Sequence, residues 1–271
     1  MLKREKILEK PYTSRFCYVI ILINCVITNL TLKVTSIIQA RMASGRLPRK
    51  VLLKLNNKSI LEHIVDFFKF SKLTDNIVIA TTTLPEDNVI EKETKRLGIE
   101  CFRGSSSDVL DRFYMCGILF KSDIVVRSTA DDPLVDPLLV DEVIHICKST
   151  GCDYASNMLH RTFPYGYSSG EGIKFKILKQ LYENLSDPLD REHVTRYIIQ
   201  NPNLYDVRNI LAPADLARPH WRLTVDYKED FDLMKEIFSR LYKPNSFIKY
   251  ESLVELLDKN PHLLQINQMH H

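Results

Sequence analysis

Hydrophobic and polar positions change their spacing repeatedly along the chain from Val34 onward. Short runs rich in β-branched residues predict buried strands at 34–38, 77–81, 99–102 and 124–127. Amphipathic stretches between them predict helices. The first opens at Ser59 with Glu62 three residues later, which forms a capping box, and the others span 86–97, 108–120 and 137–149. This alternation is typical of βαβ units around a mostly parallel sheet.

The regular alternation stops after a short strand predicted at 153–156. Residues 161–172 contain three glycines and predict a mobile loop that could cover a ligand site at the edge of the sheet. A helix at 190–200, strands at 204–210 and 221–225, and helices at 229–241 and 250–259 complete the prediction. We therefore expect an α/β fold with a doubly wound, mostly parallel sheet and a small irregular insertion, and we treat residues 33–271 as one domain.

Residues 1–32 have a different character from the rest of the chain. Basic residues precede an apolar run at 17–27, which is the order found in a signal or membrane anchor. Asn24 interrupts this run, the stretch that ends at Leu32 is shorter than the roughly 20 residues that span a bilayer, and no small-residue cleavage site follows. Two interpretations stay open, an unused or disordered leader and a hydrophobic anchor formed by residues 16–32.

Composition narrows the function classes. The 37 basic residues exceed the 34 acidic residues by only three and are spread along the chain, which argues against a duplex nucleic-acid partner. The six cysteines include no CxxC pair, so neither a zinc site nor a disulfide framework is indicated. We expect the domain formed by residues 33–271 to work in the reducing cytoplasm.

The segment 39–50 carries the clearest chemical signal. It follows the first predicted strand and reads Gln39-Ala-Arg-Met-Ala-Ser-Gly-Arg-Leu-Pro-Arg-Lys50. Ligands of parallel sheets bind beyond the carboxyl ends of the strands, where cations and backbone N–H groups can hold a polyphosphate. The spacing is not that of a Walker A loop, and a solvated charged loop is the alternative.

This segment resembles the Ala-Arg-x-x-Ser-x-Arg-Leu-Pro-x-Lys signature of the CMP-sugar synthetases, the family of the CMP-Kdo and CMP-neuraminate synthetases and of the spore-coat polysaccharide cytidylyltransferase-like proteins. Five further segments agree in the same order, at 103–112, 130–137, 156–157, 191–195 and 222–231. The agreement is closest to the spore-coat branch. It implies the nucleotide-diphospho-sugar transferase fold and a cytidylyltransferase that uses Mg²⁺ and CTP to transfer CMP to an acidic, sugar-like acceptor in cell-surface polysaccharide synthesis, with homodimers as the family habit.

The resemblance also implies roles for individual residues. The implied nucleotide site consists of Gln39, Ala40, Arg41, Ser44, Gly45, Lys50, Arg103, Gly104, Ser105, Asp108 and Asp131. The implied catalytic residues are Arg41, Arg46, Lys50 and Asp131. Asp131 and Asp226 match the two metal-binding aspartates of the family, and Mg²⁺ is typically held by one or two carboxylates together with phosphate oxygens. Asp132 and Asp136 are interpreted as helix caps. A plain turn is the alternative for the cytosine-reading segment at 103–105.

The acceptor side is less well defined. The implied acceptor-binding residues are Arg161, Glu171, Arg191, Glu192, His193 and Arg196. Guanidinium groups suit a carboxylate or phosphate, whereas a lone histidine is more often structural. Relatives usually read Pro-Asp-Gly-Leu-Asp-Val-Glu where this chain has Pro164-Tyr-Gly-Tyr-Ser-Ser-Gly-Glu171, and a glycine where it has Arg49. The acceptor therefore stays open, as do a different nucleotide, a phosphorylated non-sugar acceptor and a non-catalytic nucleotide-binding regulator.

Overall fold

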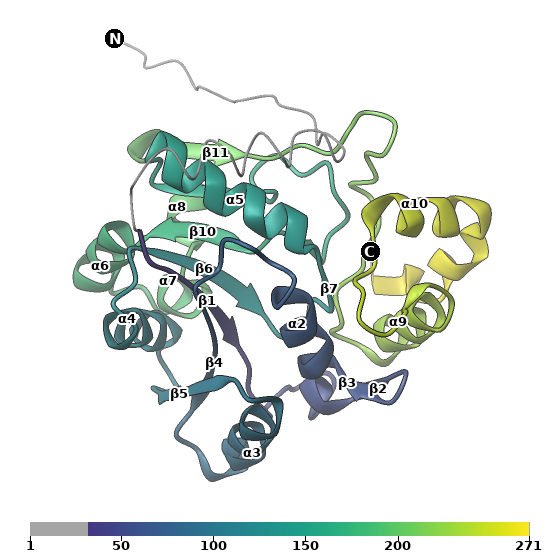
Figure 1. The fold of residues 1–271 in the computed structure, drawn as a ribbon, viewed down its shortest axis with the longest axis horizontal. Coiled ribbons are helices and arrows are strands. Elements are labelled where there is room, and N and C mark those ends of the chain that lie inside the picture. The colour runs from purple at the N-terminus through teal and green to yellow at the C-terminus, as the bar shows by residue number, and fades with distance from the viewer. Residues whose placement is uncertain (1–31, 271) are drawn as a thin grey trace.

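A seven-stranded sheet forms the centre of the computed structural model, which describes residues 32–270 (Figure 1). The strand order is β11-β8-β10-β6-β1-β4-β5. The strands are β1 (Val34–Gln39), β4 (Asn76–Thr82), β5 (Glu100–Gly104), β6 (Ile124–Thr129), β8 (Tyr154–Ser156), β10 (Glu171–Lys174) and β11 (Val207–Asn209). Only β10 runs antiparallel to its neighbours in this sheet of the described chain. The predicted α/β fold with a mostly parallel sheet is confirmed.

Helices cover both faces of this sheet. Side chains of α2 (Ile60–Phe68) and α5 (Pro137–Thr150) pack in one buried cluster together with Ile38 of β1. Side chains of α4 (Val109–Leu119), α6 (Phe175–Asn184) and α8 (Arg196–Gln200) pack in a second cluster with Ile37. Successive residues of a strand point to opposite faces, so β1 joins the two layers of the core.

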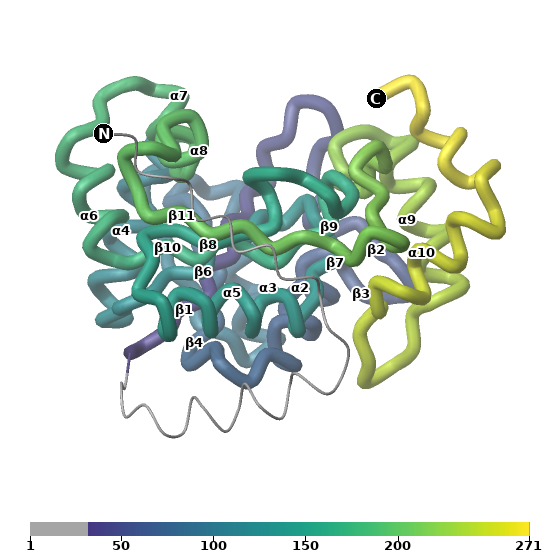
Figure 2. The backbone as a smooth tube through the Cα atoms, turned by 90° about the horizontal axis from the view of Figure 1, so that it is seen from above, coloured from purple at the N-terminus to yellow at the C-terminus, as the bar shows by residue number. Residues whose placement is uncertain are grey.

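Smaller elements complete the fold. They are the hairpin of β2 (Lys54–Leu55) and β3 (Lys58–Ser59), the parallel pair of β7 (Leu134–Val135) and β9 (Tyr167–Ser168), and the helices α3 (Asn88–Leu97), α7 (Pro188–His193), α9 (Lys228–Leu241) and α10 (Tyr250–Lys259). Figure 2 shows α6, α7 and α8 at one end of the molecule and α9 and α10 at the other. Within residues 32–270, no helix is both long and apolar enough to cross a membrane. The leader and anchor hypotheses concern residues that lie almost entirely outside this range.

Capping groups set the helix boundaries where the sequence predicted them. The Ser59 side chain accepts a hydrogen bond from the Glu62 amide at 3.0 Å and begins α2. Asp136 accepts from the Leu138 amide at 2.8 Å at the start of α5, as its interpretation as a cap requires. Gly98 ends α3 at φ 65°, in the left-handed conformation that glycine adopts readily. Asp132 instead accepts a hydrogen bond from the Thr129 hydroxyl, so its interpretation as a cap is wrong.

The predicted loop at 161–172 and helix at 190–200 are wrong in part. The loop segment contains β9 and the start of β10, and the helix α6 that follows was not predicted. Gly172 lies in the predicted loop but belongs to β10. A Cβ at this position would lie 2.6 Å from Val143 and 2.9 Å from Cys147 of α5, so the close packing of the strand against α5 requires glycine. The helix at 190–200 is divided into α7 and α8 at Val194, where φ is 44°.

The strand predicted at 221–225 is also wrong. These residues join no strand of the main sheet and form a single bridge between Arg222 and Tyr165. The Leu223 amide donates to the Tyr165 carbonyl at 2.6 Å, and the Tyr165 amide donates to the Trp221 carbonyl at 2.9 Å. The segment is buried and apolar like a strand, but its backbone groups pair with an irregular loop.

Gly166 lies at the tightest point of this pairing. Its φ is 89°, and an added Cβ would lie 2.6 Å from the carbonyl carbon of Leu223. We expect Gly166→Ala to lower the free energy of unfolding by about 3 kcal/mol or more, because a backbone clash adds to conformational strain. Gly98→Ala is the matched control, since Gly98 has φ 65° but open space around it, and it should cost about 1 kcal/mol. Equal losses in urea denaturation would contradict the clash.

Candidate active site

The Lys50 ammonium joins three segments that are far apart in the sequence. Its Nζ donates to Asp131 Oδ2 at 3.0 Å, to Asp226 Oδ1 at 3.0 Å and to the Val225 carbonyl at 2.9 Å. Lys50 starts a short 3₁₀ turn after the 39–50 loop, Asp131 follows β6, and Asp226 precedes α9. The two aspartates implied as metal ligands therefore converge on one cation.

A second set of contacts holds Asp226 in place. The Val225 amide donates to the Asp131 carbonyl at 2.8 Å, which fixes the two aspartates relative to each other. Arg222 donates to Asp226 Oδ2 at 3.0 Å and also binds Asp230, whose fully buried carboxylate accepts the Asp226 amide at 3.0 Å. Arg222 and Asp230 received no role from the sequence, although they lie four residues on either side of Asp226.

Arg46 and Arg41 lie in different surroundings although they belong to the same loop. The Arg46 guanidinium contacts Asp226 Oδ1 at 2.8 Å and lies over the Tyr227 ring, with 55% of its side chain exposed. Arg41 is 50% exposed and contacts Glu192 of α7 at 3.4 Å. The structure thus gathers Arg46, Lys50, Asp131 and Asp226 into one cluster, and Arg41 connects the loop to the predicted acceptor side.

These neighbours shift the ionisation of the cluster. Burial lowers the pKa of Lys50, but the two carboxylates outweigh it and the pKa is raised overall. Burial raises the pKa of Asp226, but Lys50, Arg222 and Arg46 outweigh it and the pKa is lowered overall. Both groups are therefore charged at neutral pH. Burial and the charge of Asp131 raise the pKa of the adjacent Asp132 to about 7.

Backbone contacts shape the 39–50 loop. Ala40 is buried and its amide donates to Ala80 at 3.1 Å, while the Ser44 hydroxyl accepts from the Leu47 amide at 3.4 Å. Arg49 has φ 60°, a conformation in which glycine carries no steric cost, which explains the glycine in relatives. Gly45 is exposed, and nothing lies within 4 Å of where its Cβ would be.

Asp87 anchors this loop and was missed by the sequence analysis. Its buried carboxylate accepts the Met42 amide at 2.7 Å and also binds the amide and hydroxyl of Thr82 at the end of β4. A helix-start aspartate is an ordinary capping signal, so nothing in the sequence pointed to this longer-range contact. Asp87 ties the loop to the edge of the sheet.

The predicted cytosine-reading turn is held by its own side chains. Arg103 donates to the carbonyls of Thr82 and Leu84, each at 2.9 Å, and to Glu91 at 2.7 Å, so its guanidinium is already committed. The Ser105 hydroxyl accepts the Asp108 amide at 3.1 Å, and Asp108 caps α4. The side chains of Arg103 and Asp108 therefore have structural roles here, whereas the backbone at 103–105 remains a predicted base contact.

Some of the predicted acceptor residues are exposed, whereas others are held in contacts within the protein. Arg161 and His193 are exposed. Arg191 donates to Asp108 at 2.6 Å and to two backbone carbonyls, and Arg196 contacts Asp190 at 2.5 Å. Glu171 is buried in an ion pair with Arg127 and accepts the Tyr154 hydroxyl at 2.6 Å, while Glu192 contacts Arg41. Acceptor binding by these residues stays a prediction.

Tyr165 is a further residue beside the aspartate cluster. The guanidinium carbons of Arg161 and Arg222 lie 5.4 and 5.6 Å from the centre of its ring. Burial raises the pKa of its hydroxyl, and so do the nearby carboxylates of Asp132, Asp131 and Asp226. Relatives carry an acidic residue after the same proline, so the departure from their pattern was the available signal.

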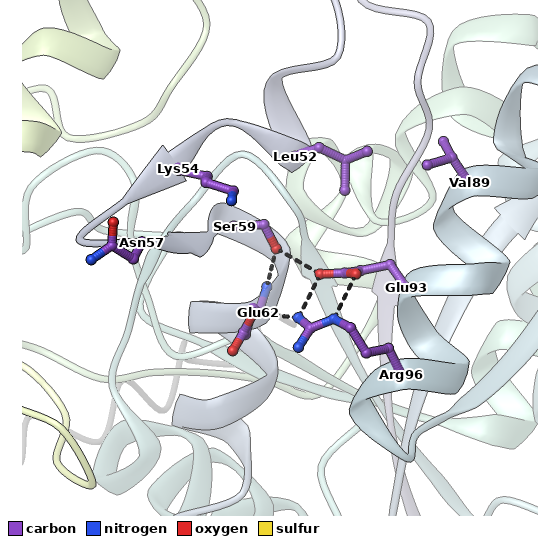
Figure 3. A pocket seen from close by; sticks show the side chains of 8 residues that line it. All are labelled: Leu52, Lys54, Asn57, Ser59, Glu62, Val89, Glu93 and Arg96. Carbon is purple, nitrogen blue, oxygen red and sulfur yellow. Dashed lines mark hydrogen bonds and ion pairs between the residues drawn. The ribbon is translucent and has the colours of Figure 1, made fainter.

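Two pockets lie outside this cluster. One of about 400 Å³ is lined by Leu52, Lys54, Asn57, Ser59, Glu62, Val89, Glu93 and Arg96 (Figure 3). Four of its polar residues bind one another, since Arg96 binds Glu93 at 2.8 Å and also Glu62, and Ser59 donates to Glu93 at 3.3 Å. The other, of about 600 Å³, is lined by Met42, Ala43, Arg49, Pro85, Glu86, Asn88, Val89 and Lys92. Neither contains a residue of the Lys50 cluster.

The Lys50 contacts predict how stability depends on pH. Asp226 has a lowered pKa when folded, so its contribution is present above the unfolded value and is lost as the pH falls through the folded value. Lys50→Met should lower the free energy of unfolding by about 2 kcal/mol at pH 7, and the difference from wild type should shrink on acidification below about pH 4. Lys58→Met, which removes a more exposed contact to Asp66, is the control and should cost under about 1 kcal/mol. A difference that stays constant from pH 7 to pH 3 in thermal melts would refute the prediction.

Comparison with known proteins identifies the family to which this chain belongs. A family model described as "Cytidylyltransferase" matches residues 35–268. The spore coat polysaccharide biosynthesis protein SpsF of Bacillus subtilis is 36% identical over 232 residues, covering 83% of this chain and 94% of that protein. The uncharacterized protein MJ1063 of Methanocaldococcus jannaschii is 40% identical, covering 87% and 95%. A solved cytidylyltransferase from Leptospira borgpetersenii is 31% identical with a TM-score of 0.81, covering 86% and 97%. The chain therefore belongs to the cytidylyltransferase family and is a nucleotidyltransferase.

Proposed function

We propose that this enzyme transfers CMP from CTP to an acidic, sugar-like acceptor, with release of pyrophosphate. The observation that carries the proposal is the convergence of Lys50, Arg46, Asp131 and Asp226 at the end of the parallel sheet. Ligands of such sheets bind at this edge, and phosphoryl transfer depends on cations and carboxylates held in place. The name of SpsF supports a role in cell-surface polysaccharide synthesis, and we place the reaction in the cytoplasm, where CTP is made.

The chain's own groups would act by positioning and charge compensation. An acceptor hydroxyl gives up its proton to water, and its oxygen attacks the α-phosphorus of CTP in line to form the new O–P bond. The bond from the α-phosphorus to the oxygen that bridges to the β-phosphate breaks. Pyrophosphate leaves with the electron pair toward Arg46 and Lys50, whose fixed positive charges offset the charge that develops on it. No protein nucleophile is needed for this displacement.

The aspartate cluster fits a Mg²⁺ ion. Asp131 and Asp226 direct oxygens at one position that the Lys50 ammonium now shares, and hard oxygen donors are what Mg²⁺ prefers. Within residues 32–270, no group of three or more acidic, histidine or cysteine side chains could hold a metal. Two carboxylates completed by phosphate oxygens match the habit of Mg²⁺ at nucleotide sites, where the ion neutralises phosphate charge.

Acceptor recognition is proposed for the side of the cluster formed by Arg161 and Tyr165. Arg161 is exposed and its guanidinium lies over the Tyr165 ring, so an entering carboxylate would meet a cation and an aromatic surface together. The acidic groups that relatives carry in this run are replaced by aromatics and serines, which lowers the negative charge that an acidic acceptor would face.

Asp131→Asn tests the proposed chemistry. The change keeps the size of the side chain but removes the charge, so pyrophosphate release from CTP should fall by at least about 100-fold while the fold is kept. The measurement is pyrophosphate release with CTP, Mg²⁺ and a mixture of acidic sugars, repeated with the other three nucleoside triphosphates.

Asp232→Asn is the matched control. Asp232 is a carboxylate of α9 that contacts Lys228 and Lys235 rather than the Lys50 cluster, so turnover should stay close to wild type. Retention of near wild-type turnover in Asp131→Asn would rule out the assigned role. Release with ATP, GTP or UTP in preference to CTP would replace cytidylyl transfer by transfer of another nucleotide.

A further inference from the structure

Arg112 is a buried arginine, and two nitrogens of its guanidinium have no hydrogen-bond partner within residues 32–270. It lies in the first turns of α4 and is only 2% exposed. Its Nε and Nη1 atoms are buried and donate to no group in residues 32–270, and no ion pair of this part of the chain includes it. Burying a guanidinium without partners is costly, so such a group indicates a ligand that completes it.

The surroundings of Arg112 place it at the nucleotide side of the sheet. Its Cγ lies 3.1 Å from the position where Gly104 would carry a Cβ, at the end of β5. The charged groups that act on it are Arg41 of the 39–50 loop, Asp87 and Asp108, while burial is the main cause of its lowered pKa. Arg112 therefore lies behind the predicted cytosine-reading turn, between that turn and the loop.

A second buried polar group without a partner belongs to the same face of the sheet. Gln39 Oε1 accepts no hydrogen bond within the described chain. Gln39 lies two residues after Ile37 on β1, and Ile37 packs in the cluster that contains Val109, Leu110 and Phe113 of α4. Because strand residues two apart point the same way, Gln39 and α4 share one side of the sheet.

We propose that Arg112 reads the cytosine base and sets the preference for CTP, an inference that rests on the proposed function. Two parallel N–H groups of a guanidinium match two adjacent acceptors. The pairing edge of cytosine offers such acceptors at O2 and N3. Uracil carries hydrogen at N3, which would face an N–H donor of Arg112. A buried site built around these donors rejects the base that leaves one unpaired.

The position of Arg112 favours a base over a phosphate as its partner. Arg41 and Arg46 have half-exposed side chains, and Lys50 lies among the carboxylates, so these three supply positive charge where a hydrated triphosphate can enter. Arg112 is enclosed beneath Gly104, where an added Cβ would also meet Phe102 at 2.8 Å. Arg112 is thus set apart from the exposed cations, and its enclosed position is unsuited to a hydrated triphosphate with its magnesium.

The first experiment uses the wild-type chain and changes the ligand. Dissociation constants for CTP, UTP, 3-deaza-CTP and inorganic tripolyphosphate are measured by calorimetry with Mg²⁺. UTP and 3-deaza-CTP should each bind about 10- to 100-fold more weakly than CTP, since each lacks the N3 acceptor. Equal binding of CTP and 3-deaza-CTP overturns the assignment to N3. Failure of CTP to bind at all overturns the proposed function, and the inference with it.

The second experiment changes the protein. Arg112→Met should weaken CTP binding by about 10- to 100-fold, leave tripolyphosphate binding within about twofold, and abolish the preference over UTP. Arg208→Met is the control, because Arg208 is a partly buried arginine whose Nε also lacks a partner within residues 32–270, but it belongs to β11 at the opposite edge of the sheet. It should retain the preference for CTP.

The outcomes separate the inference from the proposed function. Equal losses for CTP, UTP and tripolyphosphate in Arg112→Met would make Arg112 a phosphate contact and overturn base reading while nucleotide binding stands. An unchanged CTP preference in Arg112→Met would overturn it as well. If Arg112→Met does not fold by circular dichroism, Arg112→Lys keeps the cation but not the paired N–H groups and should lose the preference in the same way.

Discussion

Two carboxylates that face each other in a partly buried site need a cation between them. Asp131 and Asp226 meet this requirement through the Lys50 ammonium, at 3.0 Å from each. Without it, their mutual repulsion and the cost of burial would favour protonation of one of them or separation of the segments that carry them. This contact joins the 39–50 loop to the end of β6 and to the segment that precedes α9. The same contact that stabilises the fold therefore also assembles the charged groups that we propose for nucleotidyl transfer.

Residues of the C-terminal half hold the aspartate cluster in place. Asp230 holds the backbone at Asp226 and the guanidinium of Arg222, and Arg222 in turn lies against Tyr165. The irregular loop at 163–167 and the extended segment at 221–225 hydrogen-bond to each other, so both are fixed beside the aspartates. The residues proposed for the acceptor and those proposed for the metal are thus positioned by the same pair of hydrogen-bonded segments.

Sequence patterns predicted the N-terminal half well because its signals are local. A capping serine, a left-handed glycine and the change from twofold to helical spacing each depend on residues within one turn or one strand. The C-terminal half was predicted less well because tertiary contacts override such signals there. Gly172 is a strand residue because α5 packs against it, and the run at 221–225 satisfies its backbone with a loop rather than a strand. Val194 interrupts an otherwise regular helical pattern.

The sequence by itself determined the class of fold, the family resemblance and most of the charged residues of the cluster, because these depend on residue type and order. Only the tertiary structure decided which of them meet. It joined Lys50 to Asp131 and Asp226 but placed Arg103 and Arg191 in internal hydrogen bonds. It also buried the guanidinium of Arg112, whose Nε and Nη1 find no partner within residues 32–270. Hydrophobic periodicity predicts which face of a helix or strand is buried. It does not predict which groups the end of a long polar side chain contacts, since these depend on the elements packed around it.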